Sequence, residues 1–524
     1  MRVLAFAMLA LALAGCASTP RPADDPTLVR IDTGLLHGAR EGETIAFRGV
    51  PFAAPPVGDL RWRAPQPAAA WEGVREATAD ANDCSQLPFA QDAAPVRAPT
   101  SEDCLYLNVW RPAAPSASPL PVMVWIYGGG LTIGGISPAV YGGAAFARDG
   151  VVFVSMNYRV GRFGFFAHPA LSGEHPDEVH GNYGYADQIA ALQWVQRNIA
   201  AFGGDPGNVS IFGESAGGGS VAVMMTSPLA RGLFHKAMLQ SAGLPGGRRA
   251  AFPMRRLSGA ASGEAMGLEY ARSLGIAGEG ADAAAALRAL PGDVVRAGVG
   301  FFMPPALGAP GPMVDGKLII DDAETVFAAG GQAMVPTLIG ANDLDIGFGP
   351  AQDKAALFAT FGADAGRARA LYDPTGAADF RSVAQGVYAD RLMVEPARHV
   401  ADVMANAGQP AFHYRFSYAA ESLRPGVNGA VHASEIPYVF DTLDASLGTA
   451  QTQADRDIAA TAHAYWIAFA RSGDPNGGGR LIWPRHTTQD RQLMNFTNAG
   501  PVAGADPWQA RLDLTAALAE RAGQ

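Results

Sequence analysis

Three short, continuous apolar runs constrain the fold of this chain more than any other feature. They occupy residues 122–126, 151–155 and 209–212, and each is bounded by Gly, Pro or Asn. Such runs are typical of strands covered on both faces, because half-exposed strands alternate apolar with polar residues. Residues 185–201 have the apolar spacing of a helix and end at a Gly and Pro stop just before the third run. Strands that alternate with helices predict an α/β fold with a mostly parallel central sheet and helices on both faces.

The rest of the chain extends this pattern. Further strands are predicted at residues 335–339 and 411–418, and a closing amphipathic helix at residues 508–522. Residues 250–330, rich in Ala, Gly and Pro, are expected to form a helical excursion over the mouth of the functional site. No repeat period or low-complexity block divides the sequence. Residues 28–524 are therefore predicted to form one catalytic domain.

Composition limits the partners of this chain. Its 48% hydrophobic and 17% charged residues indicate a well-buried globular protein rather than a disordered one. A net charge of −10, with no dense run of Lys or Arg, would repel phosphate backbones and anionic headgroups. We therefore expect no nucleic-acid partner.

The N-terminus has the features of an export signal. Arg2 precedes an apolar run that is too short to span a membrane comfortably. The run ends in Leu13-Ala14-Gly15-Cys16, which resembles a bacterial lipoprotein cleavage box. This pattern predicts a signal peptide at residues 1–15, a lipid-modified Cys16 and a tether at residues 16–27. The alternative is an ordinary signal peptide with Cys16 idle. We expect a bacterial protein of the periplasm or outer membrane, which touches the membrane only through this anchor.

The remaining cysteines suit an exported protein. Without Cys16, the even pair Cys84 and Cys104 remains. A disulfide between them is the simplest interpretation, and it would restrict the unfolded chain by roughly 3 kcal/mol in the loop-entropy model. Two reduced, unrelated thiols are the alternative.

One Gly-x-Ser-x-Gly motif occurs in the chain, at Gly213-Glu214-Ser215-Ala216-Gly217. The motif alone is weak because Gly is abundant here, but it follows the predicted strand at 209–212 and precedes a helix-compatible stretch at 218–226. This strand–turn–helix setting is typical of a nucleophile elbow, where side chains at 213 and 217 would collide with adjacent backbone. Ser215 is therefore the predicted nucleophile.

A serine nucleophile also needs donors for the negative oxygen that forms on attack. Tyr127-Gly128-Gly129-Gly130 follows the predicted strand at 122–126. Its bare backbone N–H groups can point into the crevice at the carboxyl ends of the strands. In another place this glycine run would be interpreted as a flexible loop. Because it follows a strand close to the strand that leads to the serine elbow, it favours an oxyanion hole.

The general base is expected among five histidines, because hydrolases with such an elbow order their triad serine, acid, histidine along the chain. Four of the five lie in helical patterns, within a predicted strand or after a Pro: His399, His413, His463 and His486. His432 lies on a loop after a strand, where catalytic side chains are common. It is the best-placed candidate.

The acid is expected on the loop after the strand at 335–339, where the sequence offers Asp343 and Asp345. One of them would hold the imidazole in the tautomer that accepts the serine proton. The other would cap the loop or be solvated. The pattern of residues does not choose between them.

Several further motifs are specific in combination. They are Phe47-Arg-Gly-Val-Pro-Phe-Ala-Ala-Pro-Pro-Val-Gly-Asp-Leu-Arg61, Glu102-Asp-Cys-Leu-Tyr-Leu-Asn-Val109, Asn157-Tyr-Arg-Val-Gly-Arg-Phe-Gly164, Asn182-Tyr-Gly-Tyr-Ala-Asp-Gln188 and Phe202-Gly-Gly-Asp-Pro206. With the serine and glycine motifs, they make the chain resemble the type-B carboxylesterase family, particularly its bacterial para-nitrobenzyl esterases. The resemblance covers nearly everything after the export signal. It implies an α/β-hydrolase fold and hydrolysis of carboxylic esters with no metal or cofactor.

The resemblance also assigns residues. It implies oxyanion donors at the N–H groups of Gly129, Gly130 and Ala216, and His432 as the base. The same resemblance implies a disulfide between the two cysteines at 84 and 104. The family's acid, commonly Glu in an Asn-x-Asp-Glu-Gly run, falls on Asp345. The shorter Asp and the missing Gly are departures from the family pattern.

The expected substrate is a small to medium ester, aromatic esters included. Cholinesterases of this family hold a cation over a Trp in the disulfide loop, but residues 85–103 contain no Trp, so choline esters are poor candidates. Phe301, Phe302 and Met303 are candidates for the pocket wall or for plain core. The alternatives are a lipase or sterol-ester hydrolase on the same scaffold, and a non-catalytic adhesion-type relative.

Overall fold

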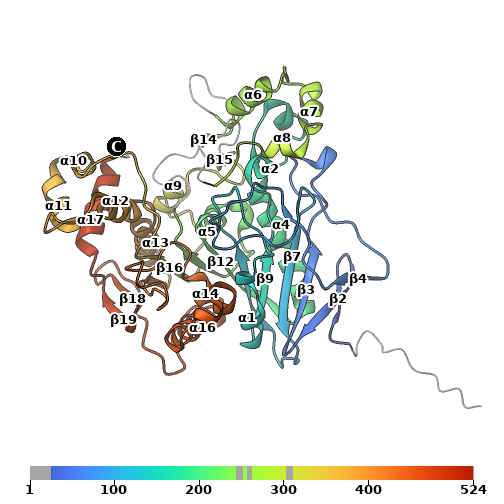
Figure 1. The fold of residues 1–524 in the computed structure, drawn as a ribbon. Helices are drawn as coiled ribbons and strands as arrows, with labels where there is room; N and C mark the ends of the chain where they lie inside the picture. The colour runs from blue at the N-terminus through green and yellow to red at the C-terminus, as the bar shows by residue number, and fades with distance from the viewer. Residues whose placement is uncertain (1–24, 244–251, 256–261, 302–310, 523–524) are drawn as a thin grey trace, which may run out of the picture.

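A long twisted sheet runs through the molecule (Figure 1). The computed structural model describes residues 25–243, 252–255, 262–301 and 311–522. Within these residues thirteen strands form the main sheet, in the order β1-β2-β3-β7-β9-β8-β12-β13-β16-β17-β18-β19, with β4 against β2. The pairs from β9 to β18 are parallel, and the two flanks are antiparallel except for β4, which pairs with β2 in parallel. The predicted α/β fold is confirmed.

The described strands and helices have the following bounds. The strands are β1 (Leu28–Ile31), β2 (Gly34–Glu41), β3 (Thr44–Pro51), β4 (Val74–Ala77), β5 (Asp83–Cys84), β6 (Thr100–Ser101), β7 (Tyr106–Pro112), β8 (Leu120–Ile126), β9 (Val152–Met156), β10 (Phe165–Phe166), β11 (Gly181–Asn182), β12 (Gly204–Glu214), β13 (Lys236–Gln240), β14 (Phe252–Pro253), β15 (Met313–Val314), β16 (Thr337–Asn342), β17 (Ala411–Phe416), β18 (Gln492–Thr497) and β19 (Gly500–Ala505). The α-helices are α1 (Ala144–Arg148), α2 (Gly161–Gly164), α3 (Pro169–Glu174), α4 (Tyr183–Asn198), α5 (Ala216–Thr226), α6 (Gly263–Ser273), α7 (Ala281–Arg288), α8 (Gly292–Arg296), α9 (Ala323–Ala328), α10 (Lys354–Ala359), α11 (Ala365–Tyr372), α12 (Phe380–Ala389), α13 (Glu395–Asn406), α14 (Ile436–Val439), α15 (Leu443–Ser446), α16 (Gln453–Ser472) and α17 (Gln509–Ala522).

The central strands are buried along nearly their whole length. Almost every residue of β8, β9, β12, β13, β16 and β17 is shielded from solvent. Because successive strand residues point to opposite faces, the sheet must be covered on both. On one face Trp125 and Phe212 pack against the ring of Phe440, with centroids 4.8 and 5.7 Å away. This coverage explains why the strands read as continuous apolar runs.

The carboxyl ends of four parallel strands meet at one edge of the sheet. Strands β8, β12, β16 and β17 end at Ile126, Glu214, Asn342 and Phe416. The loops that leave these ends contain the predicted glycine run, the serine, the two aspartates and His432. Parallel pairing thus places segments that are far apart in sequence beside one another, in the crevice where open α/β sheets bind ligands.

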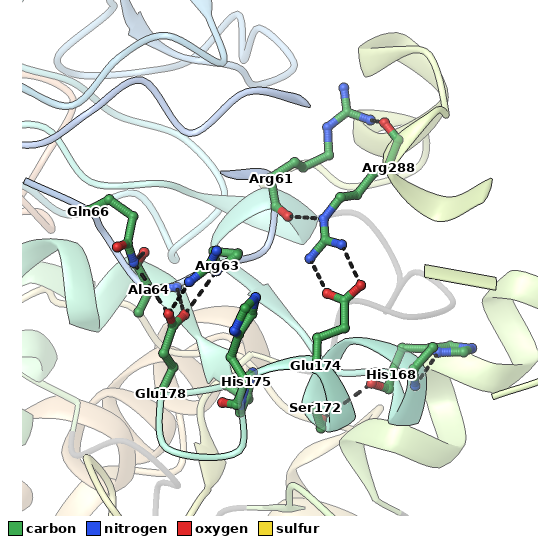
Figure 2. A network of polar contacts seen from close by, with 12 residues as sticks. Arg61, Arg63, Ala64, Gln66, His168, Ser172, Glu174, His175, Glu178 and Arg288 are labelled. Atoms are coloured by element: carbon green, nitrogen blue, oxygen red, sulfur yellow. Dashed lines mark hydrogen bonds and ion pairs between the residues drawn. The ribbon is translucent and has the colours of Figure 1, made fainter. Parts of the chain in front are cut away.

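The helices α6, α7 and α8 lie together at one end of the molecule, at the top of Figure 1. Polar contacts near buried Arg61 hold α7 there. The Arg61 guanidinium forms two bonds to the Glu102 carboxylate and donates to the carbonyl of Arg288 in α7. Figure 2 shows that Arg288 returns a bond to the Arg61 carbonyl, at 3.0 Å, and pairs with Glu174 of α3. The described part of the segment predicted to be a helical excursion is therefore mainly helical, with the short strands β14 and β15, and its helix α7 is tied to the segment that precedes Cys104.

Cys84 and Cys104 form a disulfide, as predicted, with their Cα atoms 5.0 Å apart. The other N-terminal predictions, namely the signal peptide, Cys16 and most of the tether, lie outside the described residues, as do Phe302 and Met303. In the part of the chain that the structure describes, no helix combines the length and apolarity needed to cross a membrane.

Candidate active site

Ser215 lies on a sharp turn between β12 and α5. Its backbone angles, φ 57° and ψ −125°, are unusual for a residue with a side chain and are of the kind that cluster at functional sites. The turn is possible only because its neighbours are bare. A Cβ on Gly217 would lie 2.0 Å from the carbonyl oxygen of Ile126, and one on Gly213 would lie 2.5 Å from the backbone of Gly217. The collisions expected from the motif are present, so the local sequence forces the serine off the sheet.

The glycine loop after β8 packs directly against this turn. A Cβ on Gly128 would lie 2.7 Å from the carbonyl oxygen of Glu214, so only glycine permits the approach. Gly129 and Gly130 both have positive φ, 98° and 62°. Ala216 is the first residue of α5, and its N–H is one of those that a helix leaves without an intrahelical acceptor. The glycine loop thus packs against the turn that carries Ser215, and Ala216 follows Ser215 at the start of α5.

His432 is paired with Asp345. The Nδ1 atom of His432 lies 2.5 Å from Oδ1 of Asp345, whose side chain is fully buried. The backbone N–H groups of Asn342 and Ile346 also donate to this carboxylate, at 3.1 and 2.7 Å. Burial alone would raise the pKa of Asp345, but the charge and hydrogen bond of His432 outweigh it and lower that pKa. Asp345 is therefore held ionised, in the geometry that orients an imidazole.

Asp343 takes a different place. Its Oδ1 accepts the N–H of Ala430 at 2.7 Å, two residues before His432. Between the two aspartates, Leu344 forms a parallel bridge with Val431. The structure therefore brings Asp345 to the imidazole and uses Asp343 to fix the loop that carries it.

The other candidate histidines lie in other elements of the fold, and two of them have polar partners there. His463 in α16 has Nδ1 2.7 Å from the carbonyl oxygen of Val439, and His486 has Nε2 2.7 Å from Asp402. His413 is buried within β17, where burial lowers its pKa well below the usual value. His399 lies within α13.

One cavity of about 580 Å³ opens at these residues. Ser215, His432, Gly128 and Gly129 all contribute to its wall. The rest of the wall is mainly apolar and aromatic, and it includes Phe301, the described member of the predicted pocket cluster. Ser215, His432 and the backbone of the glycine loop thus line one cavity, and side chains and backbone of these types are those that acyl transfer requires.

Two buried carboxyl groups near His432 were not singled out from the sequence, namely Glu214 and Glu435. Oε1 of Glu214 lies 3.2 Å from Nε2 of His432. Glu435 accepts hydrogen bonds from Asn342 and Gln240 and is completely buried. Glu214 stands inside the serine elbow, and Glu435 follows His432 by three residues. The position of Glu214 beside the predicted nucleophile was the available signal.

These carboxyl groups set the proton affinity of the base. Burial raises the pKa of Glu214, and the positive charge of protonated His432 opposes that rise. Burial would lower the pKa of His432, but the negative charges of Glu214 and Asp345 outweigh it and raise the pKa. A general base must be neutral before it can accept a proton. The nearby carboxyl at 214 therefore shifts the pH range in which His432 can act.

We expect Glu214→Gln to move the acidic limb of the pH profile of kcat/KM to lower pH, by about one unit. The charge that raises the pKa of His432 is removed, so the imidazole becomes neutral at lower pH. Initial rates on a neutral ester between pH 5 and 9 measure the shift. Glu76→Gln is the matched control, because Glu76 is an exposed carboxylate 2.8 Å from His37 and is not part of the described cavity wall. Superimposable profiles for both variants would contradict this account of the electrostatics.

Comparisons with known proteins support the fold and the reaction class. The chain matches the model of the Carboxylesterase family over residues 25–357 and 367–509. It is 37% identical to a fumonisin B1 esterase of Sphingopyxis macrogoltabida, over 93% of this chain and 90% of that protein. It is 32% identical to the para-nitrobenzyl esterase of Bacillus subtilis (strain 168), over 89% of this chain and 94% of that protein. A solved structure of a PNB esterase matches with a TM-score of 0.78 at 30% identity, covering 94% of this chain and 99% of that one. This chain belongs to the carboxylesterase family.

Proposed function

We propose that this carboxylesterase cleaves its substrate by a two-step acyl transfer through Ser215, His432 and Asp345. The observation that carries the proposal is the 2.5 Å contact between Asp345 and His432 at the wall of the cavity that also contains the strained Ser215 turn. Because Nδ1 of His432 is bound to Asp345, the serine proton passes to Nε2, which in this structure lies 3.2 Å from Oε1 of Glu214.

The first step forms an acyl-enzyme. The Ser215 oxygen attacks the ester carbonyl, and its proton passes to Nε2 of His432. The carbonyl oxygen becomes negative and is stabilised by the N–H groups of Gly129, Gly130 and Ala216. The intermediate then collapses, the alcohol takes the proton from His432, and the acyl group stays on Ser215.

Water completes the cycle. It attacks the acyl carbonyl while His432 takes one of its protons, and a second oxyanion forms in the same place. Collapse returns the proton to the Ser215 oxygen and releases the acid. Asp345 keeps its negative charge throughout and stabilises the imidazolium of each step. Protein groups supply every proton transfer in this scheme.

We infer that the substrates are small to medium neutral esters, aromatic esters included. Five aromatic side chains line the cavity: Phe89, Tyr141, Phe301, Tyr418 and Tyr438. The charged residues among the described wall are Asp92, Glu214 and His432, so an anionic group near the ester would meet two carboxyl groups. A volume of about 580 Å³ falls in the range of ordinary small-molecule sites. The para-nitrobenzyl esterase relative carries an aromatic ester in its name.

Para-nitrophenyl esters of increasing acyl length test this substrate class. We expect kcat/KM to be highest for short and medium acyl chains and to fall by at least about tenfold once the chain exceeds the cavity. The hemisuccinate, with a carboxylate at the acyl end, should be hydrolysed more slowly than a neutral ester of equal length. Little activity on soluble short esters, with a sharp rise above the solubility limit, would instead identify a lipase or sterol-ester hydrolase.

A further inference from the structure

Two side chains of the disulfide segment bind the backbone just beyond the predicted oxyanion loop. Gln86 forms a pair of hydrogen bonds with Gly134: its Nε2 donates to the Gly134 carbonyl at 2.6 Å, and its Oε1 accepts the Gly134 N–H at 2.8 Å. A third bond runs from Nε2 to the carbonyl of Cys84 at 2.9 Å. The side chain is buried, with 7% of its surface exposed, so water competes poorly for these bonds.

Asp83 makes a second connection, two residues further along the loop. Its Oδ1 accepts the N–H of Ile136 at 2.8 Å, and its Oδ2 is bonded to the hydroxyl of Ser137. The fit is close, because a Cβ on Gly135 would lie 2.1 Å from Oδ1 of Asp83. Asp83 and Gln86 flank Cys84, so the disulfide anchors both contacts to the segment around Cys104.

The loop between the donors and this anchor is short and hydrogen-bonded to itself. The carbonyl of Gly129 accepts the N–H groups of Thr132 and Ile133, at 3.0 and 3.1 Å. Gly134 follows with φ +116°, and a Cβ there would lie 2.4 Å from the ring of Tyr127. A displacement of Gly134 would therefore be transmitted through one turn to the peptide groups of Gly129 and Gly130.

We propose that Gln86 is a positioning residue for the oxyanion loop, which holds the donors at Gly129 and Gly130 in place through its paired bonds to Gly134. Gln86 does not line the described wall of the cavity, so it acts through the loop rather than on the substrate. The inference rests on the proposed function, because it concerns the donors of that mechanism. Asp83 supports the same loop from the next turn.

The expected kinetic signature follows from where the oxyanion forms. Donors aimed at a developing charge stabilise the transition state more than the bound ester, so their displacement lowers kcat with little effect on KM. A shift of about 1 Å in such a group can cost on the order of 100-fold in rate. A residue needed only for folding would instead lower the melting temperature and leave kcat of the folded fraction unchanged.

The test compares Gln86→Met with Gln196→Met. Gln196 in α4 is the matched control, because its Nε2 donates to two backbone carbonyls, those of Pro206 and Leu233, both at 3.0 Å and away from the cavity. We expect Gln86→Met to lower kcat on para-nitrophenyl acetate by about 10- to 100-fold with KM within about twofold of wild type. Its rate of labelling by a fluorophosphonate should fall in parallel. Gln196→Met should keep the wild-type kcat and labelling rate, whatever its melting temperature.

Equal kcat in the two folded variants would overturn the positioning role of Gln86. If Gln86→Met does not fold, Gln86→Glu and Gln196→Glu repeat the comparison with a side chain that keeps the acceptor oxygen. A lower kcat in Gln86→Glu alone supports the positioning role, and equal kcat in the two variants overturns it. Ser215→Ala separates this inference from the mechanism beneath it. A variant at 215 that retains esterase activity overturns the proposed function, whereas an inactive one combined with a fully active Gln86→Met overturns the positioning role alone.

Discussion

Ser215→Ala is expected to remove ester hydrolysis, with kcat lower by at least about 10⁵-fold, because the acyl-enzyme cannot form without the hydroxyl. The residual rate of hydrolysis comes from the oxyanion donors at residues 129, 130 and 216 and from substrate binding alone. Initial rates on para-nitrophenyl acetate measure the loss, and a fluorophosphonate should label wild type but not the variant. The fold should persist, since the bonds that shape the turn, such as Ser215 N–H to the Gln240 carbonyl at 2.9 Å, are made by the backbone.

Ser220→Ala is the matched control. Ser220 is a buried serine of α5, the helix that follows Ser215. Its hydroxyl donates to the Ala216 carbonyl at 2.9 Å and accepts from Gln188 at 3.1 Å. Its loss leaves Gln188 without that partner, which costs about 1–3 kcal/mol of stability, but removes no atom from the reaction. Activity surviving in Ser215→Ala, or vanishing equally in both variants, would refute Ser215 as the nucleophile.

Asp345→Asn is expected to lower kcat by about 10⁴-fold, whereas Asp343→Asn should change it by less than about tenfold. The amide at 345 cannot hold His432 in the tautomer that accepts a proton at Nε2, and it cannot stabilise the imidazolium. At 343 an amide oxygen can still accept the N–H of Ala430, so the histidine loop keeps its anchor. The two substitutions make the same chemical change two residues apart. Rates at saturating substrate across the pH range of wild-type activity compare them.

The reverse order of these effects would identify Asp343 as the triad acid and contradict the 2.5 Å contact of Asp345. A small effect at both positions would mean that His432 is oriented by another carboxyl, of which Glu214 is the nearest, 3.2 Å from Nε2.

The central fold was predictable because its strands are covered on both faces. The run at 209–212 belongs to β12, which begins earlier, at Gly204, because that residue pairs with Leu120 before an irregularity in register. Residues 205–208 are not apolar, so the apolar pattern did not predict that the strand extends back to Gly204. The serine turn was predictable for a steric reason, since the glycines at 213 and 217 are demanded by backbone contacts within a few residues.

The acid illustrates what sequence patterns leave open. Asp343 and Asp345 stand on the same loop with the same chemistry, and their roles depend on the bridge between Leu344 and Val431, which joins segments 87 residues apart. The family resemblance selected Asp345 despite a shorter side chain than the usual Glu. The hydrogen bonds of Gln86 and Asp83 to residues 134–137 could not be predicted either. Local periodicity does not indicate which distant backbone groups a polar side chain will contact.

A crystal structure of the protein after reaction with a para-nitrophenyl phosphonate would show which residue is the nucleophile and which groups bind the oxyanion, because the adduct copies the tetrahedral intermediate. We expect phosphorus bonded to the Ser215 oxygen, the phosphoryl oxygen within about 3.1 Å of the N–H groups of Gly129, Gly130 and Ala216, and Nε2 of His432 facing the Ser215 oxygen. Phosphorus on another residue, or a phosphoryl oxygen turned away from the glycine loop, would contradict it.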